Sequence, residues 1–173
     1  MSWLSFRALT GRSLSVALIV GLLSSGPAMA ADRGSVTNLP LPRFVSMKAS
    51  EGNVRRGPSL SHRIDWVYKR RNMPLQITAE HEHWRRVQDR DGAGGWVHYS
   101  LLSGVRTAIV EVDLLNLHAR PDASSQVNAQ LSLGVVAEVR ECQVDWCELS
   151  AGGYRGWARK GAYWGVLPQE VFE

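Results

Sequence analysis

The residues best placed to bind a metal ion are two histidines that flank one glutamate, at His81, Glu82 and His83. Residues two apart on an extended strand point to the same side, so both imidazoles could face one zinc ion. A structural zinc site has four ligands, and no third ligand stands near this pair in the sequence. We therefore interpret both histidines as solvated turn residues, and we expect neither a metal site nor a cofactor.

The carboxylates give no sign of acid and base catalysis. Asp89 and Asp91 begin a segment that is similar to a calcium loop, but Ala93 and Ser100 occupy positions that need suitable oxygen ligands. The Asp91-Gly92 pair is better interpreted as the turn of a β-hairpin. No acid and base are paired in an apolar setting, and neither a phosphate-binding glycine loop nor a serine nucleophile motif is present. We therefore expect that the protein is not an enzyme.

Two stretches of the chain, about sixty residues apart, repeat one pattern of landmarks. Each landmark is present twice: Asn53–Pro58 and Asn116–Pro121, His83–Val87 and Asp145–Leu149, and Gly95–Val97 and Gly156–Ala158. The register between landmarks shifts by only a residue or two, as expected when turns differ in length while the elements persist. The repeat predicts two copies of one small module, and small duplicated modules bind more often than they catalyse.

Hydrophobic periodicity predicts strands for both modules. Apolar residues alternate with other residues at 75–79 and 135–139, and Ile64–Tyr68 is rich in strand-favouring side chains. Turn signals rich in glycine, proline and asparagine recur every eight to twelve residues, which is typical of small all-β barrels. Residues 107–112 are too apolar for a mobile linker, so we expect them to form the first strand of the second module. The two modules should therefore be in contact.

The predicted fold class is all-β, with two tandem small barrels. The boundaries that we expect are a signal peptide at 1–30, a flexible lead-in at 31–43, the first module at 44–105, the second module at 106–168 and a C-terminal tail at 169–173.

The first thirty residues have the three parts of a secretory signal peptide. Arg7 and Arg12 provide a positive start, residues 13–23 are apolar, and Ala28-Met29-Ala30 fits a cleavage site. The apolar stretch is shorter than the roughly 20 residues that a membrane span needs, and no later segment is apolar enough. An uncleaved anchor is the alternative. We expect cleavage before Ala31, a periplasmic or secreted protein, and no membrane span after cleavage.

The two cysteines, Cys142 and Cys147, are separated by four residues in a chain that we expect to be exported. An oxidising compartment and a tight hairpin both favour a disulfide between them. The alternative is a catalytic thiolate with a histidine partner, but no motif surrounds either cysteine and the neighbouring thiol would oxidise it. We expect a structural disulfide in the second module.

The charges are distributed unevenly between the modules. Residues 31–105 contain twelve lysines and arginines and seven acidic residues, whereas residues 106–173 contain six and nine. This asymmetry could steer an anionic partner to the first module, although such imbalance is more often solvated surface. Lys69–Arg71 beside Trp66 and Tyr68 could also hold a nucleic acid by charge and stacking. Export makes nucleic acid scarce, so we expect no nucleic-acid partner.

The tryptophans of the repeat are the main candidates for ligand binding. Trp84 and Val87 are three residues apart, as are Trp146 and Leu149, so on a regular strand each pair points to opposite faces. If the aliphatic residues fill the barrels, these tryptophans lie outside the main cores. The adjacent pairs Trp96-Val97 and Trp157-Ala158 behave in the same way. Each module could present two tryptophans on one outer face, unless a loop covers them or a bulge returns one inward.

The repeated pattern resembles a bacterial SH3-type domain in tandem. The resemblance rests on four elements in the family's order: Asn53–Pro58, Trp84–Val87, Asp91-Gly92 and Gly95–Leu102. It extends from about Arg43 to Pro168 and is similar to a group of exported SH3-like proteins of alphaproteobacteria. Many second copies in that group also carry a cysteine pair around a hairpin.

The resemblance implies two SH3-like barrels of five or six strands that bind rather than catalyse. Family members often accompany cell-wall hydrolases and are thought to hold peptidoglycan or its peptides. The acidic loop that eukaryotic SH3 domains use against proline-rich peptides is replaced here by a basic segment with Arg55, Arg56 and Arg63, which argues against that kind of ligand.

Three functional hypotheses follow. The first is a binding module of the cell envelope that holds a cell-wall glycan or peptide, or an envelope protein. Its candidate ligand-binding residues are Arg55, Arg56, Trp66, Trp84, Trp96, Trp146 and Trp157. The second is an adaptor or sensor component that binds one envelope protein through an apolar patch of Trp157, Tyr163 and Trp164. The third is a small hydrolase, for which we expect no turnover of cell-wall fragments.

Overall fold

The computed structural model of the protein describes Met1 and residues 32–173. Ala31–Glu173 belong to one compact unit, which contains both predicted modules. The predicted signal peptide lies outside the described residues. Within the described part of the chain, no helix has both the length and the apolar character that a membrane crossing requires.

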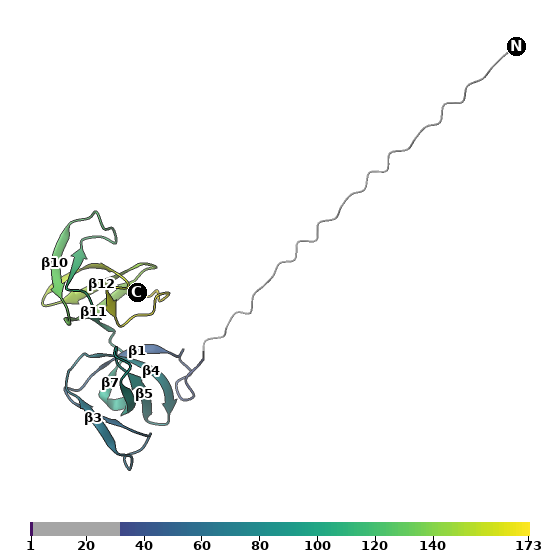
Figure 1. Ribbon diagram of the computed structural model, residues 1–173, viewed down its shortest axis with the longest axis vertical. Coiled ribbons are helices and arrows are strands. Elements are labelled where there is room, and N and C mark those ends of the chain that lie inside the picture. The colour runs from purple at the N-terminus through teal and green to yellow at the C-terminus, as the bar shows by residue number, and fades with distance from the viewer. Residues whose placement is uncertain (2–31) are drawn as a thin grey trace. The chain divides into compact units, whose positions relative to one another are not determined.

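The first module is a seven-stranded antiparallel sheet (Figure 1) with the strand order β3-β2-β6-β5-β4-β1-β7. Its elements are β1 (Arg43–Met47), β2 (Gly52–Arg55), β3 (Ile64–Tyr68), β4 (Pro74–His81), β5 (Trp84–Gln88), β6 (Gly94–His98), the 3₁₀ helix η1 (Tyr99–Leu101) and β7 (Leu102–Ser103). The strand β7 follows β6 in the chain but pairs with β1 at the far end of the strand order, so the sheet curls into a barrel-like body.

The second module repeats this topology strand for strand, with the order β10-β9-β13-β12-β11-β8-β14. Its elements are β8 (Thr107–Val110), β9 (Leu114–His118), β10 (Val127–Ser132), β11 (Val136–Cys142), β12 (Trp146–Ala151), β13 (Tyr154–Arg159) and β14 (Tyr163–Trp164). The all-β prediction and the prediction of a duplicated module are therefore confirmed. The prediction that residues 107–112 begin the second module is also confirmed, since β8 starts at Thr107.

Each module has its own hydrophobic core. The first core contains Met47, Val54, Tyr68, Leu75, Ile77, Val87 and Val97. The second core contains Ala108, Val110, Leu115, Leu117, Leu131, Ala137, Val139, Cys142, Cys147, Leu149, Ala158 and Tyr163. Equivalent strands supply equivalent residues, for example Val87 and Leu149, which are 1% and 0% exposed. Burial of these alternating apolar side chains drives the formation of both sheets.

The glycine that precedes the second repeated tryptophan has a steric cause in both modules. A Cβ atom on Gly95 would lie 2.7 Å from the carbonyl oxygen of Arg55, and one on Gly156 would lie 2.7 Å from the carbonyl oxygen of His118. The strand before each tryptophan therefore crosses the first hairpin so closely that no side chain fits. This close crossing explains why a glycine precedes the tryptophan in both copies of the repeat.

The segment before β1 has specific contacts, in contrast to the flexible lead-in that the sequence suggested for 31–43. Its turn is closed by hydrogen bonds from the amide of Gly34 to the carbonyl of Leu39 (2.8 Å) and from the amide of Asn38 to the carbonyl of Gly34 (2.9 Å). The buried carboxylate of Glu80 in β4 accepts hydrogen bonds from the amide (2.8 Å) and the hydroxyl (2.7 Å) of Thr37. A polar sequence without hydrophobic periodicity gave no sign of this long-range clamp.

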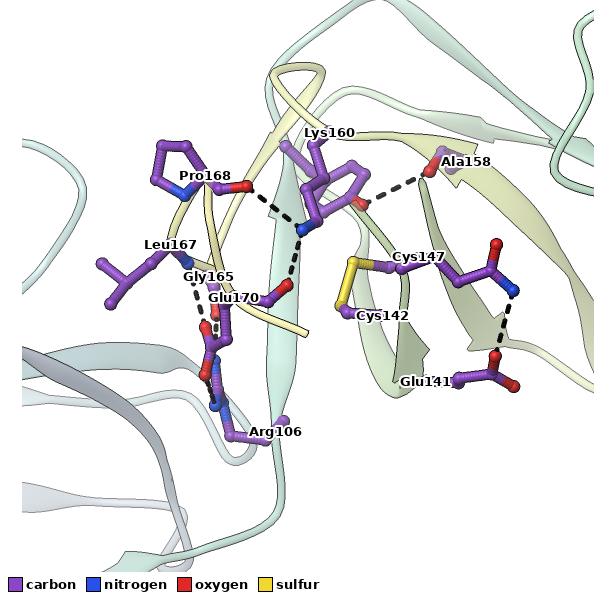
Figure 2. Close-up of a disulfide and its surroundings, with 12 residues drawn as sticks. Arg106, Glu141, Cys142, Cys147, Ala158, Lys160, Gly165, Leu167, Pro168 and Glu170 are labelled. Atoms are coloured by element: carbon purple, nitrogen blue, oxygen red, sulfur yellow. Dashed lines mark hydrogen bonds and ion pairs between the residues drawn. A yellow bond between two sulfur atoms is a disulfide. The ribbon is translucent and has the colours of Figure 1, made fainter. Parts of the chain in front are cut away.

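The C-terminal segment closes the second module (Figure 2). Cys142 and Cys147 form a disulfide, and Cys142 exchanges two backbone hydrogen bonds with Phe172 in the tail. The carboxylate of Glu170 accepts hydrogen bonds from the Arg106 guanidinium, one of them 2.8 Å long, and pairs with its charge. The tail predicted at 169–173 is therefore tied to the barrel at several points.

The two modules contact each other within the same compact unit. The hydroxyl of Thr107 at the start of β8 donates to the carbonyl of Asn72 (2.8 Å). The ring of Phe44 in β1 packs edge-on against Trp164 in β14, with 4.8 Å between the ring centroids. The ring contact joins the first strand of the first module to the last strand of the second.

Candidate functional site

The four tryptophans of the repeat lie outside both hydrophobic cores, as the strand parity predicts. They are not equally accessible. Trp84 is only 7% exposed, whereas Trp96, Trp146 and Trp157 are half-buried. Trp84 is therefore not the open platform that the sequence suggested, because His98 packs edge-on against it with 5.4 Å between ring centroids.

Trp96 lies in a row of side chains that crosses three strands of the first module. In the sheet register it is paired with Arg55 of β2 on one side and Arg86 of β5 on the other. Directly paired residues project to the same face of a sheet, so Trp96 has an arginine as its neighbour on each side of this face. His81 approaches the same indole edge-on, at 6.5 Å between centroids. This row gives the first module a cationic and aromatic outer face.

Next to this row, four rings form a cluster that we call the aromatic cluster: Trp84, His83, His98 and Tyr99. The centroid of Tyr99 lies 5.0 Å from that of His98 and 5.7 Å from that of His83, and the two imidazoles are 6.0 Å apart. Tyr99 is 50% exposed. Hydrogen bonding holds the ring of His98, whose Nδ1 lies 2.7 Å from the hydroxyl of Ser100 in η1.

The aromatic cluster can bind by stacking and by hydrogen bonding. Aromatic rings offer large apolar faces, and the hydroxyl of Tyr99 and the imidazole nitrogens add polar groups at the rim. The guanidinium of Arg85 lies 5.9 Å from the Tyr99 ring, which places a cation beside the cluster. The cluster therefore suits a ligand that combines a flat or apolar surface with hydroxyl, amide or carboxylate groups.

The predicted arginines have internal partners. Arg55 Nη1 donates to the carbonyls of Leu60 (2.9 Å) and His62 (2.7 Å), so this side chain closes the loop of the first hairpin. Arg56 Nε lies 3.5 Å from the carboxylate of Asp65. Arg56 remains mostly exposed, whereas Arg55 is half-buried beside Trp96. These hydrogen bonds hold the Arg55 guanidinium in one position, from which it contributes positive charge to the site.

Trp66 does not join the other tryptophans of the first module. It is paired with the core residue Val54, so it projects to the face of the sheet opposite to Arg55 and Trp96. It lies in the edge strand β3 and is 36% exposed. Its neighbour Tyr68 is edge-on at 6.3 Å between centroids. Trp66 belongs to a separate surface of the first hairpin.

In the second module, charged side chains are paired with the tryptophans of the repeat. Trp146 is paired with Arg159, whose guanidinium lies 5.6 Å from the indole, and His118 is edge-on at 5.6 Å. Trp157 is paired with Glu148 and His118, and Glu148 forms an ion pair with Arg155. Other side chains of the second module thus partly cover its two indoles. The aromatic cluster is a feature of the first module.

The apolar patch expected for an adaptor is not formed in the second module. Tyr163 is a core residue at 4% exposure, and Trp164 packs against Phe44. Tyr163 and Trp164 do line an open groove of about 780 Å³, together with Lys160. The ammonium of Lys160 donates to the backbone carbonyls of Pro168 and Glu170 (Figure 2). This lysine therefore ties down the C-terminal segment.

The two histidines considered for zinc do not share a strand face. Strand β4 ends at His81, and Glu82 adopts a left-handed conformation (φ 44°) in the turn that precedes β5. The turn directs His81 toward Trp96 and His83 toward Tyr99. Among the described residues, no group of three or more histidine, cysteine or acidic side chains has a geometry suited to a metal ion.

Sequence reasoning missed His98, Tyr99 and Arg86 as parts of the site. The register of β5 and β6 brings Arg86 beside Trp96, and the start of η1 folds Tyr99 back toward His83. The available signal was the parity of β6, because His98 is two residues after Trp96 and must share its face. The position of Tyr99 depends on the turn and was not accessible to a parity argument.

Comparison with known proteins supports the architecture. The family described as "Bacterial SH3 domain" matches residues 48–104 and again residues 111–165. No significant match is found among curated proteins.

Solved structures that match the chain include NlpC2 and NlpC1 from Trichomonas vaginalis and an NlpC/P60 family protein from Bacillus cereus. Their sequence identities to this chain are 11%, 12% and 10%, with TM-scores of 0.34, 0.35 and 0.32. The alignments cover 72%, 80% and 69% of this chain, and 48%, 51% and 55% of those proteins. The chain therefore spans about half the length of these structures.

Proposed function

We propose, since the chain belongs to the bacterial SH3 domain family and carries two copies of the domain, that it is a non-catalytic binding protein of the cell envelope. Its ligand is peptidoglycan or a cell-wall peptide, and the first module holds it. The observation that carries this proposal is the aromatic cluster with the exposed ring of Tyr99, which the second module lacks.

The chemistry of the site supports a cell-wall ligand. Sugar rings have apolar faces that stack on aromatic side chains, and peptide stems carry amide and carboxylate groups. The rings of His83, His98 and Tyr99 provide the stacking surface, while Arg86 beside Trp96 provides a positive charge for a carboxylate. Such a site binds through several weak contacts at once, which suits attachment to a polymer with many repeats.

The expected location of the protein agrees with this ligand. The sequence predicts a signal peptide, and the disulfide between Cys142 and Cys147 is typical of proteins that fold in an oxidising compartment. The alternative function, an adaptor that binds through Trp157, Tyr163 and Trp164, receives no support, because Tyr163 is buried and Phe44 covers Trp164.

The test is co-sedimentation of residues 31–173 with purified cell-wall sacculi. We expect retention at low salt, and we expect Tyr99→Ala to weaken it by several-fold to about tenfold, the effect of one lost aromatic contact. Tyr154→Ala is the matched control, since Tyr154 is 61% exposed in β13 of the second module, away from the cluster.

Two results would contradict the proposal: no retention of the unmodified protein, or equal losses for Tyr99→Ala and Tyr154→Ala. A turnover assay on released cell-wall fragments accompanies the binding assay. Appearance of cleaved products would show that the protein is an enzyme and would replace the binding function.

A further inference from the structure

The outermost strand of the first module, β3, has a free edge. It pairs with β2 on one side, and no described strand pairs with its other side. In Figure 1 it lies at the rim of the first module, in a hairpin that extends away from β5. The outward backbone N–H and C=O groups of this strand have no backbone partner among the described residues. Such an edge is a template for one more strand.

The side chains of β3 are exposed on both faces. Ile64, Trp66 and Val67 are 41%, 36% and 36% exposed, and the adjacent residues Trp66 and Val67 project to opposite faces. Only Tyr68 at the end of the strand is buried. Proteins usually protect an edge strand with a proline or a charged side chain, but the one charge in β3, that of Asp65, is held within the hairpin. Apolar surface therefore remains available next to the open edge.

The hairpin around this edge is strongly basic. Between Gly52 and Asn72 the chain contains six lysines and arginines and one acidic residue, Asp65. The carboxylate of Asp65 accepts two hydrogen bonds from Arg63, at 2.9 and 2.7 Å, which keep its pKa below the usual value. Arg56 also lies 3.5 Å from this carboxylate, whereas Lys69, Arg70 and Arg71 form no ion pair among the described residues.

The second module has the same fold, so it shows whether the fold itself requires a basic edge strand. Its edge strand β10 occupies the same place in the sheet order as β3. The corresponding stretch, from Leu115 to Val135, contains one basic and one acidic residue, Arg120 and Asp122. The fold alone therefore does not require a basic edge.

We propose that β3 binds an extended, acidic segment of a partner protein as an added strand of the first sheet. The backbone edge of β3 would supply hydrogen bonds, Ile64, Trp66 and Val67 would contact apolar side chains, and the surrounding cations would select for carboxylates. A second copy of this strand is disfavoured as the occupant, since two hairpins with the same positive charge repel each other.

The experiment uses residues 31–173, labelled with ¹⁵N, and a hexapeptide of alternating glutamate and valine with blocked ends. We expect amide shifts confined to β3 and its flanks, with no shifts in β10. The reversed-charge peptide of lysine and valine should not bind. The glutamate–valine peptide with N-methylated alternate residues should also not bind, because it keeps the charge and loses the strand hydrogen bonds.

Charge reversal provides the second measurement. Lys69→Glu combined with Arg71→Glu changes two exposed side chains and should weaken the glutamate–valine peptide about tenfold at low salt. Asn128→Glu combined with Gln130→Glu in the exposed edge of β10 is the matched control and should have no effect.

Four results would overturn this proposal: no binding of the glutamate–valine peptide, shifts centred outside β3, equal binding of the N-methylated peptide, or dimerisation through β3. Equal binding of the N-methylated peptide would indicate a general affinity for polyanions. Tyr99→Ala should leave peptide binding unchanged, so failure of this proposal and failure of cell-wall binding can be distinguished.

Discussion

The carboxylate of Glu80 should stabilise the first module by holding the N-terminal segment in place. Its side chain is 0% exposed and accepts hydrogen bonds from the amides of Val36 (3.0 Å) and Thr37 (2.8 Å), and from Arg43 Nη2 (2.6 Å). Arg85 Nε lies 3.5 Å away. Burial raises the pKa of this carboxyl, but the donors from Thr37, Arg43 and Val36 outweigh burial and lower it to about 2.

The size of this stabilisation follows from the pKa difference. An unfolded glutamate titrates near 4.5 and the folded one at about 2, a difference that corresponds to about 3 kcal/mol of stability at neutral pH. Because the pKa is lowered on folding, the contribution is fully present above pH 4.5 and is lost as the pH falls toward 2. About 1 kcal/mol or less should remain near pH 2.5.

The test compares the unmodified protein with Glu80→Gln, which keeps the shape of the side chain and removes its charge. Urea unfolding at pH 7 should show a loss of about 2 to 3 kcal/mol in the first module, and this difference should shrink to about 1 kcal/mol or less at pH 2.5. Other carboxylates titrate in both proteins and cancel in the difference. The second module has a separate core, so its unfolding should not change.

A difference between Glu80→Gln and the unmodified protein that is equally large at pH 7 and pH 2.5 would refute the reasoning. It would show that the substitution acts through shape or packing and not through the charge of the carboxylate. A loss in the second module of the same size would show that the two modules unfold as one unit and would remove the internal control.

Three further predictions concern stability. Replacing Cys142 and Cys147 by serine should cost about 2 kcal/mol in the second module alone, the value for a short closed loop, as measured by urea unfolding; an unchanged midpoint would contradict it. Gly95→Ala and Gly156→Ala should each cost about 1 to 3 kcal/mol, because the new Cβ meets a carbonyl oxygen, and thermal unfolding of each variant measures this loss. Glu170→Gln should release the C-terminal segment, seen as faster amide hydrogen exchange at Phe172, while exchange in the first module stays the same.

Much of the fold was predictable because the two copies of the module share the same landmark residues at nearly the same spacing. The repeated tryptophans and the aliphatic residues three positions later fixed the orientation of β5 and β12, and Val87 and Leu149 are core residues as that parity requires. Short strands with turns at regular spacing have few alternatives to a small barrel. Local patterns were informative here because half of the strand pairings in each sheet join strands that are consecutive in sequence.

The contacts of the candidate site were less predictable because they join distant residues. Parity placed Trp84 outside the core, but the ring of His98 that shields it comes from another strand. Arg55 was a candidate for ligand binding, yet it donates to the carbonyls of Leu60 and His62. The clamp between Glu80 and Thr37 joins residues more than forty positions apart. A single sequence carries no periodic signal for such polar contacts.

The two copies of the domain differ in their stabilising contacts and in the surfaces that we propose for binding. The second module has the disulfide, the Arg106–Glu170 ion pair and the tail at Phe172, and its indoles are partly covered by its own charged side chains. The first module has no disulfide and exposes Tyr99, together with a basic hairpin. Exposed rings and clustered like charges lower the stability of a domain of about 60 residues, which is marginal to begin with. The contact between Phe44 and Trp164 joins the module that carries the exposed ring and the basic hairpin to the module that carries the disulfide and the bound tail.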